Sequence, residues 1–289
     1  MKLITFETEG DIGAGFLDGD TVVICATGGA ARHGVLKVIT GDDGGLAAWH
    51  AAAGRRVPLA DVRLMAPIPE PRRDLFCVGK NYYAHAAEFH SSGFDSSAKE
   101  QVPAHPVIFT KATTSVCGPG ATVRASLDPT ASVDYEGELG VVIGKRCFQT
   151  AKADALDHVF GYVVINDITS RELQKRHNQW VIGKSVDTFC PMGPWIATAD
   201  EVGDVRELEL VTEINGDERQ RVRVADLIFD IPTLIETMSR TMTLLPGDII
   251  ATGTPVGVGI GFKPPKYLQP GDTMRVRITA LGTLENTVG

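Results

Sequence analysis

The chain has 289 residues, of which 43% are hydrophobic and 22% charged, a composition that indicates a globular protein long enough to bury a packed core. Its formal net charge of −8 argues against nucleic acid as the main partner, and without a long apolar run or signal-peptide core we expect a cytoplasmic protein that does not bind membranes. The five cysteines are widely spaced and form no C-x-x-C pair, which argues against a disulfide framework and against a thiolate zinc site.

Residues 1–70 are predicted to form a small N-terminal α+β domain. Short strands are expected at 2–6 and 21–24, with turns at 10–11 and 18–20 between them, and a helix at 46–53. The segment 67–72 contains three prolines, each of which fixes φ and biases the preceding residue away from helix. This segment is therefore predicted to be an extended connector, and we place the domain boundary there.

The second domain, 71–289, is predicted to open with a buried strand at 75–78 and a short, Ala-rich helix at 84–88. On that helix His85 and Glu88 stand at i and i+3 and share a face. A carboxylate can orient an imidazole and raise its basicity, so the two residues are candidates for a general-base pair. The alternative is an ordinary pair on a helix surface.

The polar stretch 89–103 shows no periodic pattern. A loop of that length without structure of its own is typical of a lid or a linker. Because it follows the His–Glu pair directly, we expect a lid around 85–103, with a merely flexible surface loop as the alternative.

An acidic strand is predicted at 133–143. Within it Glu136 and Glu138 stand at i and i+2, and on a strand these positions point to the same face. Two neighbouring carboxylates raise each other's pKa unless a cation compensates them, and a hard divalent ion with oxygen ligands would do so. The alternative is an exposed strand face where both side chains point to water.

Asp167 follows a near-continuous apolar strand at 159–165, where a third carboxylate ligand would be useful. It is also a candidate N-cap, because the residues after it favour a helix. Arg171 and Gln174 stand at i and i+3 on that helix.

The rest of the chain offers a lysine and a glycine-rich loop. Lys184 lies in a mixed Gly, Ser and apolar stretch rather than in a run of charges, which favours a specific role. A hairpin is predicted around Asn215-Gly216, and a helix at 228–243. The loop 251–259 is not a P-loop, but its N–H and hydroxyl groups could donate to an anion.

These features together resemble the fumarylacetoacetate hydrolase superfamily over roughly residues 75–289. The resemblance rests on five motifs in order: Val78-Gly79-Lys80-Asn81-Tyr82 with His85 and Glu88, Asp134-Tyr135-Glu136-Gly137-Glu138-Leu139, Asn166-Asp167-Ile168-Thr169-Ser170-Arg171, Gly183-Lys184-Ser185-Val186-Asp187, and Thr252-Gly253-Thr254-Pro255.

The resemblance implies a strand-dominated α+β fold with rolled, layered mixed β-sheets, assembled as a homodimer. It also implies Mg²⁺ or Mn²⁺ as cofactor, with Ca²⁺ as a substitute in crystals, and a small keto or diketo acid as substrate. Carried over residue by residue, it assigns the metal to Glu136, Glu138 and Asp167, general-base catalysis to His85 with Glu88, charge stabilisation to Lys184, and substrate binding to Arg171, Gln174 and Thr254.

The function that follows first is hydrolysis of a C–C bond in an acylpyruvate-like acid, in which the ion stabilises an enolate and His85 activates water. The alternatives are oxaloacetate decarboxylation, or tautomerisation or hydration of a related keto acid, on the same scaffold. A different class is a metal-binding protein without activity. His85, Glu88 and Lys184 beside the acidic residues argue against that class.

Overall fold

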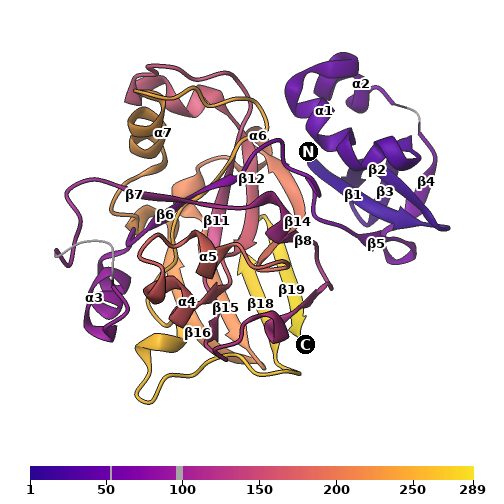
Figure 1. The fold of residues 1–289 in the computed structure, drawn as a ribbon. Coiled ribbons are helices and arrows are strands. Elements are labelled where there is room, and N and C mark those ends of the chain that lie inside the picture. Colours follow the sequence, from indigo (N-terminus) through magenta and orange to yellow (C-terminus); the bar gives the residue numbers. More distant parts are fainter. Residues whose placement is uncertain (53, 96–99) are drawn as a thin grey trace.

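The computed structural model describes residues 1–52, 54–95 and 100–289, and Figure 1 shows their arrangement. The fold is mixed α+β and strand-dominated, as predicted, with several mixed sheets. Within the described residues, no helix is both long and apolar enough to cross a membrane.

The N-terminal elements, drawn in indigo in Figure 1, lie at one side of the molecule. They are β1 (Lys2–Thr8), β2 (Asp11–Asp18), β3 (Thr21–Thr27), α1 (Gly34–Thr40), α2 (Gly45–His50), β4 (Arg56–Pro58) and β5 (Arg63–Leu64). The sequence did not predict β2 or α1. The glycines of β2 obscured its strand pattern, yet Gly15 is needed there because a Cβ would lie 2.0 Å from the carbonyl oxygen of Val23.

The remaining elements follow after residue 74. The strands are β6 (Leu75–Gly79), β7 (Val107–Lys111), β8 (Val116–Cys117), β9 (Thr122–Val123), β10 (Val133–Asp134), β11 (Gly137–Ile143), β12 (Val159–Asn166), β13 (Thr169–Ser170), β14 (Cys190–Thr198), β15 (Glu209–Ile214), β16 (Asp217–Arg223), β17 (Ile249–Ala251), β18 (Thr273–Ile278) and β19 (Gly282–Val288). The helices are α3 (Tyr83–Ser92), α4 (Arg171–Arg176), α5 (Val181–Lys184), α6 (Ala199–Val202) and α7 (Ile231–Ser239), with 3₁₀ turns that include η6 (Lys152–His158) and η9 (Gly259–Gly261).

The largest sheet runs through both parts of the chain. Its order is β4-β3-β2-β1-β14-β12-β11-β17-β6-β7, and β1 joins it by antiparallel pairing of Leu3 with Ile196 in β14. A second sheet has the order β16-β15-β18-β19-β9. Because backbone pairing crosses between the two parts, the division at residue 70 stays a prediction.

The core fixes the two strands that carry the acidic residues. All seven residues of β11 are buried, and in β12 only the first two are not. Val141 and Val164 pack into one apolar cluster together with α7 and the second sheet, whereas Val142 and Val163 pack into another. Strands covered on both faces read as continuous apolar runs, and they form a rigid base for side chains at their ends.

Several predicted boundaries are corrected. The helix expected at 84–88 extends to Ser92, so residues 89–92 are helical rather than loop, and residues 96–99 of the expected lid lie outside the described residues. The helix expected at 228–243 is shorter than predicted, since α7 spans Ile231–Ser239. It begins at Ile231 because Asp230 caps it by accepting the N–H of Thr233. The hairpin turn is confirmed: Asn215 and Gly216 have φ of 54° and 84°, as a type I′ turn requires.

Candidate active site

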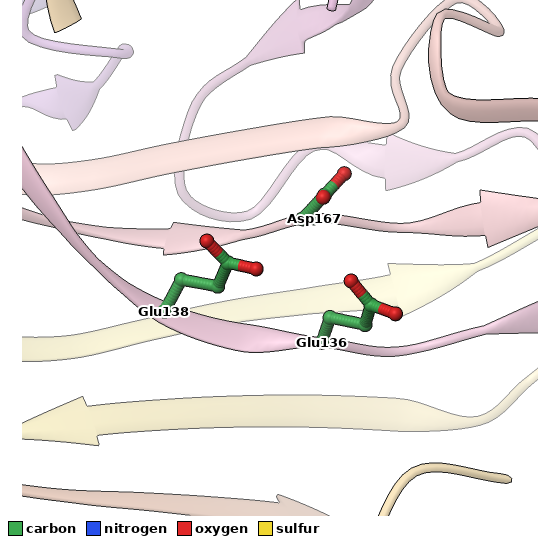
Figure 2. A group of neighbouring side chains, drawn as sticks. All are labelled: Glu136, Glu138 and Asp167. Atoms are coloured by element: carbon green, nitrogen blue, oxygen red, sulfur yellow. The ribbon is translucent and has the colours of Figure 1, made fainter. Parts of the chain in front are cut away.

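The two glutamates of the acidic motif do not share one continuous strand. β10 ends at Asp134 and β11 begins at Gly137, so Glu136 precedes the strand that contains Glu138. The N–H of Glu136 donates to the side-chain oxygen of Asn166 instead of a strand partner (3.0 Å). The predicted strand at 133–143 is therefore interrupted. The two side chains nevertheless leave the chain on the same side (Figure 2).

Asp167 brings a third carboxylate to this point from the end of β12. One ligand atom from each of Glu136, Glu138 and Asp167 lies within 4.8 Å of the others, and all three residues are buried. The N–H of Asp167 donates to the carbonyl oxygen of Glu136 at 2.8 Å, which ties the two segments together. Asp167 is not an N-cap, because α4 begins only at Arg171 with Ser170 before it. The prediction of a helix cap is wrong, and the carboxylate of Asp167 belongs to the acidic cluster instead.

Two buried lysines pair with these carboxylates. The Nζ of Lys184 lies 2.7 Å from Glu136 and 2.6 Å from Asp167, and the Nζ of Lys111 lies 2.6 Å from the other oxygen of Asp167. Lys111 also donates to the carbonyl oxygens of Ile168 and Lys184. No role was predicted for Lys111. Its only sequence signal is a lysine directly at the end of an apolar strand.

Arg171 links the acidic cluster to a fourth carboxylate. Its Nε lies 2.8 Å from Asp134, and its Nη1 lies 2.6 Å from Glu136 and 3.3 Å from the Oε1 of Gln174. Its buried Nη2 has no hydrogen-bond partner among the described residues. A buried donor without a partner is costly, so Nη2 is well suited to a substrate carboxylate. Asp134 belongs to the acidic motif, but the sequence did not assign it a role.

The pKa values of the two glutamates are shifted in opposite directions. Burial raises the pKa of Glu136, but Lys184, Arg171 and His85 outweigh burial and bring it down to about 2. Burial raises the pKa of Glu138 well above its ordinary value, and Asp167 and Glu136 add to the rise, although the N–H of Gly253 donates to its carboxylate at 2.8 Å.

The donor set fits a divalent cation. Four buried carboxylates (Asp134, Glu136, Glu138 and Asp167) face three buried cations (Lys111, Arg171 and Lys184), so with all four ionised one negative charge would lack a partner. Carboxylate oxygens are the ligands that Mg²⁺ and Mn²⁺ prefer. A divalent ion held by Glu136, Glu138 and Asp167 would remove the conflict at Glu138 and leave a net charge that suits an anionic substrate.

His85 and Glu88 form a pair on α3. The Nδ1 of His85 lies 3.2 Å from the Oε2 of Glu88, and His85 is buried. The Glu88 carboxylate also accepts the N–H of Gly257 at 3.1 Å. His85 stacks on Phe89, which contacts Trp180 edge-on. The imidazole of His85 therefore lies in a partly aromatic environment. It is oriented by the Glu88 carboxylate, which the N–H of Gly257 fixes in turn.

The glycine-rich loop has a different role from the one predicted. Its N–H groups donate to the protein's own carboxylates: Gly253 to Glu138, Gly257 to Glu88 and Gly259 to Asp134. They are therefore not available for an external anion as the sequence suggested. The hydroxyl of Thr254 is also engaged, because it donates to the carbonyl oxygen of Gly137 and accepts from Gln220.

One cavity collects most of the predicted site residues. Its lining includes His85, Glu136, Glu138, Arg171, Gln174, Lys184 and Thr254. The other two predicted residues, Glu88 and Asp167, contact residues that line it. The sequence did not predict the aromatic wall of Phe89, Phe109 and Trp180, or Lys80 beside it. These residues are distant from the acidic motif in sequence, and no local pattern relates them to it.

Comparison with known proteins gives family matches for nearly the whole chain. Residues 74–289 match the family described as fumarylacetoacetate (FAA) hydrolase C-terminal, and residues 1–67 match the family described as Rv2993c-like, N-terminal. A curated relative, oxaloacetate tautomerase YisK of Bacillus subtilis (strain 168), is 50% identical over 231 residues, which cover 80% of this chain and 74% of the relative.

Two solved structures are similar over the full chain. Fumarylacetoacetate hydrolase (EaFAH) from psychrophilic Exiguobacterium antarcticum has a TM-score of 0.82 and 39% identity, covering 100% of this chain and 99% of that one. Maleylpyruvate hydrolase from Sphingobium sp. SYK-6, solved in complex with manganese(II) ion and pyruvate, has a TM-score of 0.77 and 34% identity, covering 100% and 98%. The chain therefore belongs to the fumarylacetoacetate hydrolase family of enzymes.

Proposed function

We propose that this protein is a metal-dependent enzyme that moves a proton at the carbon next to the keto group of a 2-keto acid, with oxaloacetate tautomerisation as its first activity. The observation that supports this most is the meeting of two features in one cavity. One is a buried acidic cluster that has one more carboxylate than it has cationic partners, and the other is the His85–Glu88 pair. Proton transfer next to a carbonyl needs a base and a means of stabilising the enolate.

Each group has a distinct task in this proposal. When bound by Glu136, Glu138 and Asp167, a divalent cation would polarise the keto oxygen. The free Nη2 of Arg171 binds the substrate carboxylate, with Gln174 beside it. The ammonium group of Lys184 stabilises negative charge that develops on the substrate oxygen.

His85 is the proton carrier. The imidazole takes a proton from the carbon next to the keto group and delivers it to the enolate oxygen, which gives the enol; in ketonisation it takes the hydroxyl proton of the enol and delivers it to that carbon. Glu88, 3.2 Å from Nδ1, keeps the ring oriented and stabilises its charged form. The same base would instead deprotonate water if the substrate were an acylpyruvate, and the C–C bond would then be cleaved by hydrolysis.

Similarity to known proteins changes the order of the candidate reactions. Hydrolysis was the first candidate reaction predicted from the sequence, but the relative at 50% identity is named an oxaloacetate tautomerase. Acylpyruvate hydrolysis remains the second candidate, supported by the similar maleylpyruvate hydrolase structure. That structure also supports Mn²⁺, with Mg²⁺ as the other candidate ion. The homodimer and the cytoplasmic location stay predictions.

A substrate panel tests the proposal. The purified protein, with Mg²⁺ or Mn²⁺, is assayed for loss of enol absorbance from oxaloacetate and for pyruvate release from oxaloacetate and acylpyruvates. We expect ketonisation of enol-oxaloacetate to be fastest, and His85→Ala to lower it by about 100-fold or more. Pyruvate release as the faster reaction would favour the hydrolase or decarboxylase. If the protein converts none of the 2-keto acids tested, the remaining alternative is a metal-binding protein without activity.

A further inference from the structure

The His85–Glu88 pair on α3 is held by a loop near the C-terminal end of the chain. We infer that residues 257–261, here named the seat loop, position Glu88 and through it the imidazole of His85. Gly257 and Gly261 are then positioning residues for the reaction. This inference rests on the proposed function, because it takes His85 as the base.

The seat loop holds the Glu88 carboxylate from two sides. The N–H of Gly257 donates to both carboxylate oxygens, at 3.1 and 3.3 Å. At Gly261 a Cβ would lie 1.9 Å from the Oε1 of Glu88, and the next two nearest atoms also belong to Glu88. The carboxylate therefore occupies the space that a side chain at 261 would need, while its other contact orients His85.

Apolar packing joins the same two segments. Phe89, next to Glu88 on α3, is buried in a cluster with Val258 and Ile260 of the seat loop and with Trp180. The helix is thus held by side-chain packing as well as by the carboxylate. Because α3 has only ten residues and no side-chain cap at its start, these contacts contribute much of what fixes its position.

The seat loop is itself fixed to the metal side of the cavity. Asp134 accepts the N–H groups of Gly259 (2.6 Å) and Ile260 (3.1 Å), and it pairs with the Nε of Arg171 (2.8 Å). Arg171 in turn pairs with Glu136. A continuous series of contacts therefore runs from a metal ligand through Asp134 and the seat loop to the base, and this gives the base a fixed position relative to the cation.

Gly261→Ala is a specific test of this arrangement. The φ of Gly261 is not in the left-handed region, so alanine fits its backbone and the added methyl group meets Glu88 alone among its nearest atoms. We expect kcat to fall by about 10- to 100-fold, because small displacements of a catalytic group have effects of that size. KM and the affinity for Mn²⁺ should change less than about 2-fold. Gly29→Ala is the matched control, since a Cβ there meets nothing within 4 Å.

A double-mutant cycle with Glu88→Ala separates positioning from general damage. If Gly261 acts through Glu88, the double variant should have the same kcat as Glu88→Ala, because alanine at 88 vacates the space. Losses that add, or an unchanged kcat in Gly261→Ala, would overturn the inference.

Hydrogen–deuterium exchange of α3 gives a readout that needs no activity. We expect faster exchange in residues 83–92 for Gly261→Ala and no change for Gly29→Ala. Unchanged exchange in Gly261→Ala would count against the seat loop. If the wild-type protein turns over no 2-keto acid, the proposed function fails, and the exchange experiment still decides whether the loop positions the helix.

Discussion

At the scale of single residues, the acidic cluster is defined by unequal pairing. Glu136 and Asp167 each have cationic partners at hydrogen-bond distance, whereas Glu138 is held by the N–H of Gly253. The pKa of Glu138 is accordingly raised well above its ordinary value by burial and by its acidic neighbours. A cation would relieve this strain most at Glu138, so this residue should control metal affinity.

Glu138→Gln tests that expectation. Removal of the charge should weaken Mn²⁺ binding by about 100-fold or more, since loss of even an outer partner of a ligand costs 10- to 100-fold. The metal-free variant should fold normally, because a neutral amide is easier to bury than a carboxylate. Calorimetric titration with Mn²⁺ measures the effect, with Glu172→Gln on the exposed face of α4 as the control. Tight binding and full activity in Glu138→Gln would rule out the metal role.

At the scale of elements, the sequence predicted which strands and helices exist better than it predicted their ends. The strand rule placed Glu136 and Glu138 on one face, although Asn166 interrupts the strand at that point. Lys111 could not be found from the sequence, because its contact with Asp167 depends on how two strands far apart in the chain are positioned. The glycine-rich loop was recognised by composition, but which carboxylates its N–H groups meet is a property of the tertiary structure.

The start of α7 offers a test of the fold that is independent of the site. Asp230 accepts the N–H of Thr233 at 2.9 Å and pairs with Lys152 at 3.0 Å. Asp230→Ala should lower the free energy of unfolding by about 1 kcal/mol, as expected for a lost helix cap, and leave kcat unchanged. Urea denaturation measures the difference. Asp226→Ala, at an exposed position shortly before Asp230, is the control. An equal loss of unfolding free energy in both variants would show that the helix cap is not the cause.

At the scale of the whole molecule, one sheet connects the N-terminal part with the strands that carry the site. β1 pairs with β14, β14 with β12, and β12 with β11. The acidic residues at the ends of β11 and β12 therefore lie on a scaffold to which both parts contribute. Binding of a cation at these residues should accordingly stabilise the entire fold rather than one loop.

Metal stabilisation should depend on pH. Without metal, the raised pKa of Glu138 means that the folded state keeps a proton which the unfolded state has lost. Stability therefore decreases as pH rises from the ordinary glutamate pKa through the raised value. A bound cation removes this penalty, so the increase in Tm on adding Mn²⁺ should be larger at about pH 8 than at about pH 6.

The size of this effect can be measured by thermal unfolding with and without a chelator. At a metal concentration about 100-fold above Kd, the cation should add about 2.7 kcal/mol to the free energy of unfolding. An increase in Tm that is the same at both pH values would mean that Glu138 is not a ligand. In Glu138→Gln the pH dependence should disappear.

In the proposed reaction, a metal ion and His85 together move a proton at the carbon next to the keto group. The most direct measurement is deuterium incorporation at C3 of oxaloacetate in D₂O, followed by NMR with Mg²⁺ present. The wild-type protein should accelerate exchange by at least about 100-fold over buffer with Mg²⁺ alone, and both a chelator and His85→Ala should abolish that acceleration. Exchange that persists in His85→Ala, or without metal, would contradict the proposed roles of His85 and the metal.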